Sequence, residues 1–513
     1  MLLFLLGTVS VYFSLDFFRW KRWPREIIAL SLLLILGLIL PLTFSGSNFD
    51  QQLFGVWGRN IGLFTHFSSF LIFIWAISIV QRREFMRNLN FYFSLVSTIS
   101  LSYGFAQSLG FDFVPWNPPQ IFGTLGNTNF YGAHTAIIFS MALGFFTLSK
   151  PTRKQKIFLT LILIGSLFLT LRTEAFQGVV IIAITSTIAG HIWLRKVGLV
   201  KTAHSYLAFS LLFASLGLLG LIGLGPLAGL LASEATTLIF RFYFWQAAIK
   251  MFTSNAVYGV GLDSYGDWYR VSRPNSAYFG GDLGETADSA HNLLLDYAAT
   301  GGTLLLIFGL LLFALSTKSA LRILYLKNSS STNIALAPYA FGFIGFLIQS
   351  MVSPISIGLL VWGFLFAGLV FGSNIEFKER NLTQNLKRTR TNSRFTAIYA
   401  LLVFLSFTLA IMPISKEYRV LRTQKSENAI DFANAIAAFP TSAHLYREGV
   451  SLLEKAQYYG RAFELASKGA LDFPRDYRLL EFSTTLRALD STTQKLLLIQ
   501  LEEIDPPRLL DKS

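Results

Sequence analysis

Long, nearly charge-free apolar runs recur along most of this chain and constrain its fold more than any other feature. A helix needs about 20 apolar residues to cross the hydrocarbon core of a bilayer. Runs of that length, or close to it, fall at 2–17, 27–45, 61–80, 91–108, 129–148, 156–171, 175–193, 204–230, 291–316, 333–352, 354–372 and 395–413. With 53% hydrophobic and 14% charged residues, the chain is too apolar for a soluble protein of 513 residues. The sequence therefore predicts an all-α, polytopic membrane protein with about twelve transmembrane helices.

Basic residues occupy every second loop between these runs. The clusters fall at 19–25, 82–87, 150–156, 195–201, 318–327 and 378–394. Loops enriched in Lys and Arg lie on the cytoplasmic side of membrane proteins, so we expect the other loops and both termini to lie outside. The net charge of +14 is distributed over these orientation signals, which argues against a nucleic-acid partner.

The apolar runs end near residue 413 and divide the chain into two parts. We expect a membrane-embedded domain over 1–413, with a large outer loop at 231–290, and an extracytoplasmic helical tail over 414–513. Prolines in the tail recur close to the ~34-residue period of tetratricopeptide (TPR) repeats, at positions 440, 474 and 506. Ala462 falls where that repeat has its small helix-packing residue. The tail is therefore predicted to be a TPR-like module that contacts a protein partner, a substrate or the rim of the membrane domain.

One outward segment, 110–128, is rich in residues that interrupt helices. It contains prolines at 115, 118 and 119 beside Trp116 and continues into the sequence GTLGNTNFYGAH. Its glycines and asparagines, among them Asn127, predict a turn into the span at 129–148. A re-entrant loop that lines a cavity is the alternative, because a bilayer tolerates such backbone only where protein or water satisfies its polar groups.

Two arginines lie close to the predicted hydrocarbon on the outer side. Arg172 begins the turn RTEAFQG, where a charge is costly unless it snorkels, pairs with Glu174 or binds an anion. We expect snorkelling or pairing, with phosphate binding as the alternative. Arg241 begins the amphipathic stretch RFYFWQAAIKMF, which is predicted to lie on the membrane surface. There Arg241 and Trp245 form either an interfacial anchor or a diphosphate site, for which the permanent, bidentate guanidinium suits Arg.

The outer loop ends in ADSAHNLLLDY, where His291 is the sharpest candidate for chemistry. It is the only histidine at an outward junction of loop and helix in polar surroundings, three residues after Asp288 and directly before Asn292. A neutral imidazole takes a proton from a hydroxyl group near neutral pH. We expect Asp288 or Ser289 to cap the following helix, so that capping does not explain the histidine.

Arg270 and Arg273 lie in the middle of the same loop, near three aspartates at 263, 267 and 282. We expect solvated ion pairs there, with binding of an anionic substrate as the alternative. The chain has no cysteine and none of the patterns HxxxH, HExxH or an Asp-rich cluster. Neither a metal nor another cofactor is therefore predicted.

These segments together resemble the O-antigen ligase and polymerase superfamily. The resemblance rests on Arg241 and Trp245, GVG at 259–261 followed by Tyr265 and Tyr269, AHN at 290–292, and Gly302. The sequence GTLGNTNFYG around Asn127 is similar to the GTxGNxN segment of that family. The similar stretches cover most of residues 90–372.

The chain also departs from the family pattern at two places. The family commonly has a Ser-Arg pair after the sixth span, whereas here Arg172 precedes Thr173 and Glu174. The second glycine of the usual GxxG is Leu305. The first departure concerns a phosphate-binding residue, and the second concerns helix packing.

The resemblance implies a metal-independent, GT-C-like glycosyltransferase of the bacterial cytoplasmic (inner) membrane, with its active site on the extracytoplasmic side. His291 and Arg241 would be the catalytic residues. The candidate substrate-binding residues are Arg172, Trp245, Arg270, Arg273, Asn292 and Asn127. The implied partners are a glycan donor linked to undecaprenyl diphosphate, a hydroxyl-bearing acceptor that is a lipid, polysaccharide or protein, and membrane lipids.

Two other classes of function fit the same sequence. A transporter or flippase for lipid-linked saccharides would bind the diphosphate with the same arginines, but it predicts charged residues along a path at mid-membrane. The apolar runs carry almost no charge, which favours the enzyme. A non-enzymatic scaffold for polysaccharide assembly, built on the tail, is the third possibility.

Overall fold

All regular elements in the described part of the chain are helices. The computed structural model describes residues 6–10, 23–80, 83–113, 120–149, 151–279, 286–325, 331–375, 393–426, 428–486, 489 and 491–505. The predicted all-α class is therefore confirmed for these residues. The predicted run at 2–17 and the three prolines at 115–119 fall mostly or wholly outside them.

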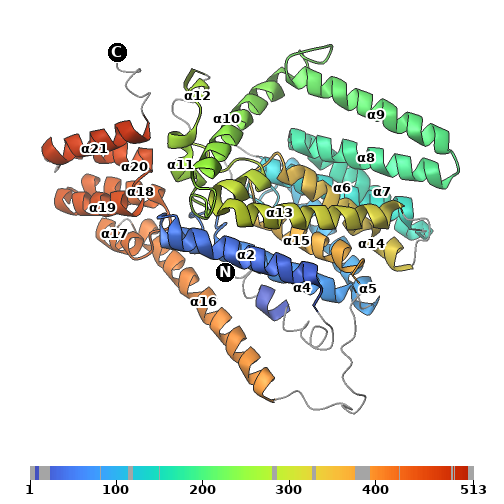
Figure 1. Cartoon of the computed structure of the whole chain (residues 1–513), viewed down its shortest axis with the longest axis horizontal. Helices are drawn as coiled ribbons and strands as arrows, with labels where there is room; N and C mark the ends of the chain where they lie inside the picture. Colours follow the sequence, from blue (N-terminus) through green and yellow to red (C-terminus); the bar gives the residue numbers. More distant parts are fainter. Residues whose placement is uncertain are drawn as a thin grey trace.

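The helices form a bundle, a helical outer segment and a helical tail (Figure 1). The first half of the bundle contains α2 (Arg25–Phe44), α3 (Phe49–Phe54), α4 (Leu63–Ile79), α5 (Arg83–Ser108), α6 (Thr128–Leu148), α7 (Arg153–Arg172), α8 (Phe176–Lys196) and α9 (Val200–Leu221). The outer segment contains α10 (Ala232–Ser254), α11 (Tyr265–Ser272) and α12 (Ser276–Phe279). The second half contains α13 (Leu293–Tyr325), α14 (Ser331–Ser350) and α15 (Ile357–Gly372).

Several of these helices have the properties of membrane spans. Six are long and apolar enough to cross a bilayer, namely α2, α6, α7, α8, α9 and α13. The apolar parts of α4, α14 and α15 are shorter. One hydrophobic core joins α2, α4, α6, α8, α13, α14 and α15, with ring contacts such as Phe73 on Phe371 at 5.8 Å between centroids. The chain is therefore an integral membrane protein with a packed helical centre.

The bundle has two chemically different ends. At one end the Nζ of Lys196 donates to the carbonyl of Thr147, and His191 meets Tyr325 at 3.2 Å. These contacts bring together the ends of α6, α8 and α13, beside which the described basic clusters at 153–156, 195–201 and 318–322 lie. At the other end Asn292 donates to the carbonyl of Met351, and Gln177 donates to that of Asn129. We call this second end the polar end.

The predicted eighth span and the outer loop differ from the structure. The run at 204–230 does not form one helix, because α9 ends at Leu221 and a turn through Gly223 and Gly225, both with positive φ, follows it. The stretch expected as loop is largely helical, with α10 running at a steep angle from the end of α9 to the start of α13 (Figure 1). Helix α10 thereby carries Arg241 to the polar end.

Gly302 holds the outer segment against α13. This glycine has φ of 70° inside α13 and interrupts its helical geometry. A Cβ there would lie 2.6 Å from the carbonyl oxygen of Val257, so only glycine allows the backbone after α10 to pack this closely. The amide of Thr303, left without a helical partner at the kink, donates to the carbonyl of Ala256. The kink thus fixes the segment between α10 and α11 over the start of α13.

The tail packs onto the polar end. Helix α16 (Ser393–Lys425) contains the predicted span at 395–413 and continues into the tail, which also contains α17 (Ala429–Ala437), α18 (Ala443–Lys455), α19 (Tyr459–Asp472), α20 (Tyr477–Ser483) and α21 (Ser491–Ile504). Ala462 is fully buried in its core. The ring of Phe54 lies 5.4 Å from that of Phe439, and the guanidinium of Arg475 lies 3.8 Å over the ring of Trp268. The tail therefore contacts the rim of the bundle, and its classification as TPR-like stays a prediction.

We expect Asp505→Ala to loosen this docking. Arg270 and Arg273 bind Asp505 at 2.7 and 3.0 Å, and all three side chains are buried. Removing one partner of a buried ion pair costs about 3–5 kcal/mol, because the other charges stay buried without compensation. Amides of α20 and α21 should exchange with solvent about 100-fold faster, measured by hydrogen exchange. Glu503→Gln, an exposed change on α21, is the control, and equal exchange in both variants would contradict the docking role.

Candidate functional site at the polar end

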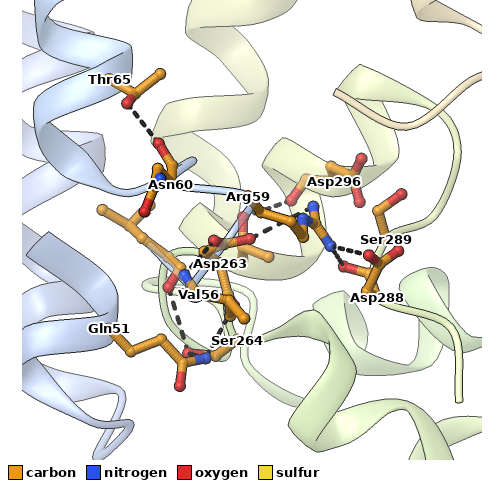
Figure 2. A network of polar contacts seen from close by, with 12 residues as sticks. Gln51, Val56, Arg59, Asn60, Thr65, Asp263, Ser264, Asp288, Ser289 and Asp296 are labelled. Atoms are coloured by element: carbon orange, nitrogen blue, oxygen red, sulfur yellow. Dashed lines mark hydrogen bonds and ion pairs between the residues drawn. The ribbon is translucent and has the colours of Figure 1, made fainter. Parts of the chain in front are cut away.

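Arg59 lies at the centre of the polar end, in the loop between α3 and α4. Its guanidinium forms ion pairs with Asp288 at 2.9 Å and Asp263 at 3.4 Å, and it also donates to the carbonyl of Asp288. Figure 2 shows the guanidinium pointing between these two carboxylates, which come from segments more than 200 positions away in the sequence. The loop is fixed in turn, because the amide of Val56 donates to the Asp263 carboxylate at 2.7 Å. Arg59 therefore joins the loop between α3 and α4 to the outer segment.

The charges around Arg59 reinforce one another. Burial alone would lower the pKa of Arg59, but the carboxylates of Asp263 and Asp288 outweigh it and raise that pKa above its ordinary value. Burial raises the pKa of Asp263, and the nearby guanidinium offsets part of this shift. Arg59 is thus a permanent cation held in a fixed orientation by partners on both sides.

His291 lies three residues after Asp288 in the sequence, and its backbone has an unusual conformation. Its φ is 53°, in the left-handed region that few non-glycine residues occupy. Its amide donates to the hydroxyl of Ser289 at 3.1 Å, and its ring lies 5.0 Å from that of Phe244. Strained backbone of this kind persists only where surrounding contacts enforce it, and it is frequent at functional sites.

The hydrogen bonds of His291 select one neutral tautomer. Nδ1 lies 3.2 Å from the carbonyl oxygen of Ser289, which only accepts, and 3.4 Å from the hydroxyl of Ser289, which can donate or accept; the shorter contact, to the carbonyl, favours the proton on Nδ1. Burial lowers the pKa of His291, and the positive charges of Arg241 and Arg59 lower it further against the opposing effect of Asp288. The ring is therefore neutral at pH 7, with an unprotonated Nε2 for which the described residues offer no hydrogen bond. Such a nitrogen can accept a proton from a hydroxyl group.

Arg241 lies near His291 and has an unsatisfied donor. It is half-buried on α10, one turn before Phe244, and its charge acts on the pKa of His291. Its Nε and the Nε1 of Trp245 are both buried without a hydrogen-bond partner among the described residues. Burial lowers the pKa of Arg241, with Glu234 opposing the shift. Unpartnered buried donors are rare in proteins, so this pair of side chains is suited to an anionic ligand.

The two asparagines proposed to bind substrate are both helix caps. The side-chain oxygen of Asn292 accepts from the amides of Leu294 and Leu295. The expectation that Asp288 or Ser289 caps α13 is therefore wrong. Asn127 caps α6 by accepting from Asn129, and Gly123 and Gly126 form the predicted turn with positive φ. In the structure both side-chain oxygens are committed to backbone amides.

Arg172 ends α7 on the same side of the bundle, and its side chain is exposed. The expected pair with Glu174 is absent, although both residues belong to the described part of the chain. The start of α8 beside it contacts the start of α6, where Gln177 donates to Asn129 at 2.7 Å. The structure leaves Arg172 available to solvent or lipid, and its substrate-binding role stays a prediction.

Arg270 and Arg273 are buried, whereas the sequence led us to expect solvated ion pairs. They are 4% and 3% exposed and form their ion pairs with Asp505 of the tail, while Asp282 lies outside the described residues. The expectation is wrong because it considered only partners within the loop. Their present contacts hold the tail, although Arg270 also lines a cavity described below.

Arg59 was not among the site residues predicted from the sequence. The chain offered one signal, a basic residue in an outward loop, where the orientation rule leaves few. Its partners Asp263 and Asp288 are more than 200 positions away, so no local pattern connects them to Arg59. The described residues contain no group of three or more His, Cys, Asp or Glu side chains placed to hold a metal ion.

The fold and the site together define a polytopic membrane protein with an arginine- and histidine-containing centre at one end of its bundle. Residues 158–314 match the family model for O-antigen ligase. The match includes Arg172, Arg241 and His291 and ends within α13. The family is one of membrane proteins that handle glycans. No curated protein matches the chain significantly.

Proposed function

We propose that the protein transfers a glycan from a polyprenyl-diphosphate donor, such as undecaprenyl diphosphate, to a hydroxyl group of an acceptor. The proposal rests on two observations: the Nε of Arg241 is buried without a hydrogen-bond partner among the described residues, and the ring of Phe244, one turn after Arg241 on α10, lies 5.0 Å from the ring of His291. Arg241 suits a diphosphate and His291 suits a hydroxyl group, and both lie at the polar end. The match of residues 158–314 to the O-antigen ligase family model supports the same chemistry.

In this mechanism His291 acts as general base and Arg241 as electrostatic partner. Nε2 of His291 takes the proton of the acceptor hydroxyl as its oxygen attacks the anomeric carbon of the donor sugar. The bond between that carbon and the diphosphate oxygen breaks, and the lipid diphosphate leaves with the electron pair. Arg241 compensates the negative charge that develops on the leaving group. The proton then passes from His291 to solvent or to the leaving group.

We further propose that the polar end faces outward from the bacterial cytoplasmic membrane. The described basic clusters at the opposite end support this orientation, since such clusters lie on the cytoplasmic side. A lipid diphosphate supplies its own leaving group, so the reaction needs neither nucleotide nor metal. The acceptor is a lipid, a polysaccharide or a protein.

The test is transfer by purified protein in detergent. The full chain is incubated with a lipid-linked glycan and a hydroxyl-bearing acceptor extracted from the producing cells, in EDTA and without nucleotide. We expect the glycosylated acceptor and free polyprenyl diphosphate to appear in equal amounts. Movement of the intact donor across vesicles without either product would instead identify a flippase and reject the proposal.

A further inference from the structure

A cavity of about 240 Å³ lies between the tail and the polar end. Its bundle side includes Gln51, Arg59 and Asp288, three residues of the network in Figure 2. Its tail side includes residues at the starts of α18 and α20, among them His444 and Tyr477. Neither the tail nor the bundle forms this cavity alone.

The cavity adjoins the proposed catalytic residues through Asp288. The carboxylate of Asp288 lines the cavity, pairs with Arg59 at 2.9 Å and acts on the charge of His291. The cavity also lies on the side of Arg59 that the extramembrane tail covers. A polar ligand in it would therefore contact the segment 286–288, which leads directly into His291.

The lining combines both signs of charge with unsatisfied donors. It contains four aspartates and four arginines, at 263, 267, 288 and 476 and at 59, 270, 447 and 475. The Nε of Arg447 is buried without a hydrogen-bond partner among the described residues. Burial, followed by the charge of Asp476, raises the pKa of Asp267 to about 7, so this group both donates and accepts near neutral pH.

This balance identifies the chemical class of the ligand. With as many arginines as aspartates, the lining offers little net attraction to a phosphate, and an apolar chain would leave the buried Nε of Arg447 without a partner. Sugar hydroxyls donate to carboxylates and accept from guanidinium groups, so they suit a lining that contains both. The modest volume suits a short saccharide segment.

We propose that this cavity is a saccharide-binding subsite, built jointly by the tail and the outer segment, that presents the sugar of one substrate to His291. The inference rests on the proposed glycan transfer and gives the tail a role in it. The sugar belongs either to the acceptor or to the donor, and kinetics distinguish the two. A defect at the subsite raises the KM of the substrate whose sugar it binds.

The absence of cysteine from the chain permits a direct test. His444→Cys places a single thiol at an exposed position that lines the cavity, and Arg461→Cys places one at an exposed position on α19 outside it. The alkylation rate with N-ethylmaleimide is measured with and without two probes. These are the oligosaccharide released by mild acid from the cells' lipid-linked donor, and the isolated acceptor.

We expect one probe to slow alkylation of H444C about tenfold at ten times its Kd, and to leave R461C unaffected. The alkylated H444C protein should show a raised KM for that same substrate. Equal alkylation of H444C with and without both probes would overturn the subsite. Because protection measures binding rather than turnover, it gives a result even if the parent protein transfers no glycan, an outcome that would reject only the proposed function.

Discussion

Replacing His291 by alanine should lower the rate of glycan transfer about 100- to 10,000-fold, the range for loss of a general base. The reason is geometric. Nδ1 is bound to the Ser289 carbonyl, so Nε2 is the one imidazole nitrogen able to receive a proton. The measurement is single-turnover transfer at saturating donor, with donor binding measured separately and expected to change little. Equal transfer by wild type and His291→Ala would remove the histidine from the mechanism.

The pH profile separates catalysis by His291 from a structural role. Burial lowers the pKa of His291 below its ordinary value of 6.5, so the base is neutral, and active, at pH 7. Transfer should therefore fall only as pH drops below 6.5, when the ring gains a proton. His291→Gln should lose this acid limb along with most of its activity. His204→Ala, an exposed change on α9 at the opposite end of the bundle, is the matched control and should leave the profile unchanged.

Replacing Arg241 by glutamine should lower kcat/KM for the donor about 100- to 1,000-fold, as found when one charge-stabilising donor is removed from an active site. The Nε of Arg241 is buried without a hydrogen-bond partner among the described residues, so a diphosphate there gains a hydrogen bond that those residues do not supply. Arg241→Lys should recover only part of the loss, because an ammonium group keeps the charge and loses the bidentate geometry.

The control for Arg241 is on the same helix. Lys250 is exposed on α10, and its Nζ donates to the carbonyl of Val271. Lys250→Gln removes one positive charge from α10 without touching the site and should transfer glycan at the parent rate. If donor affinity is unchanged in Arg241→Gln, the phosphate role is excluded, whatever the effect on turnover.

The two ends of the bundle show which structural features local sequence patterns can predict. Apolar runs and basic clusters are local signals, since each reports the solvent around one segment. They therefore predicted the helices and the gathering of the described basic clusters at one end. The same signals placed a span at 204–230, because hydropathy does not register the turn at Gly223 and Gly225 that ends α9 and begins the approach to α10.

For the site, too, local patterns predicted some features and tertiary packing determined the others. The sequence predicted that His291 lies at a junction of loop and helix. It also predicted that Arg241 lies on the outer side of the spans. Their mutual proximity was not predictable, because it depends on the path of α10 and on the kink at Gly302. The burial of Arg270 and Arg273 was likewise hidden, since their partner Asp505 is more than 230 positions away.

Local patterns along the chain were enough to predict a helical membrane protein, the loops that are basic and the residue types available for chemistry. Hydrophobicity and charge act through the nearest solvent, so a linear pattern records them. The tertiary structure decided that Arg59 joins Asp263 to Asp288, that Asn292 caps a helix beside a histidine with a free Nε2, and that the tail forms one wall of a cavity. The contacts of Arg59 and of the tail join segments whose distance in space depends on how the whole bundle packs.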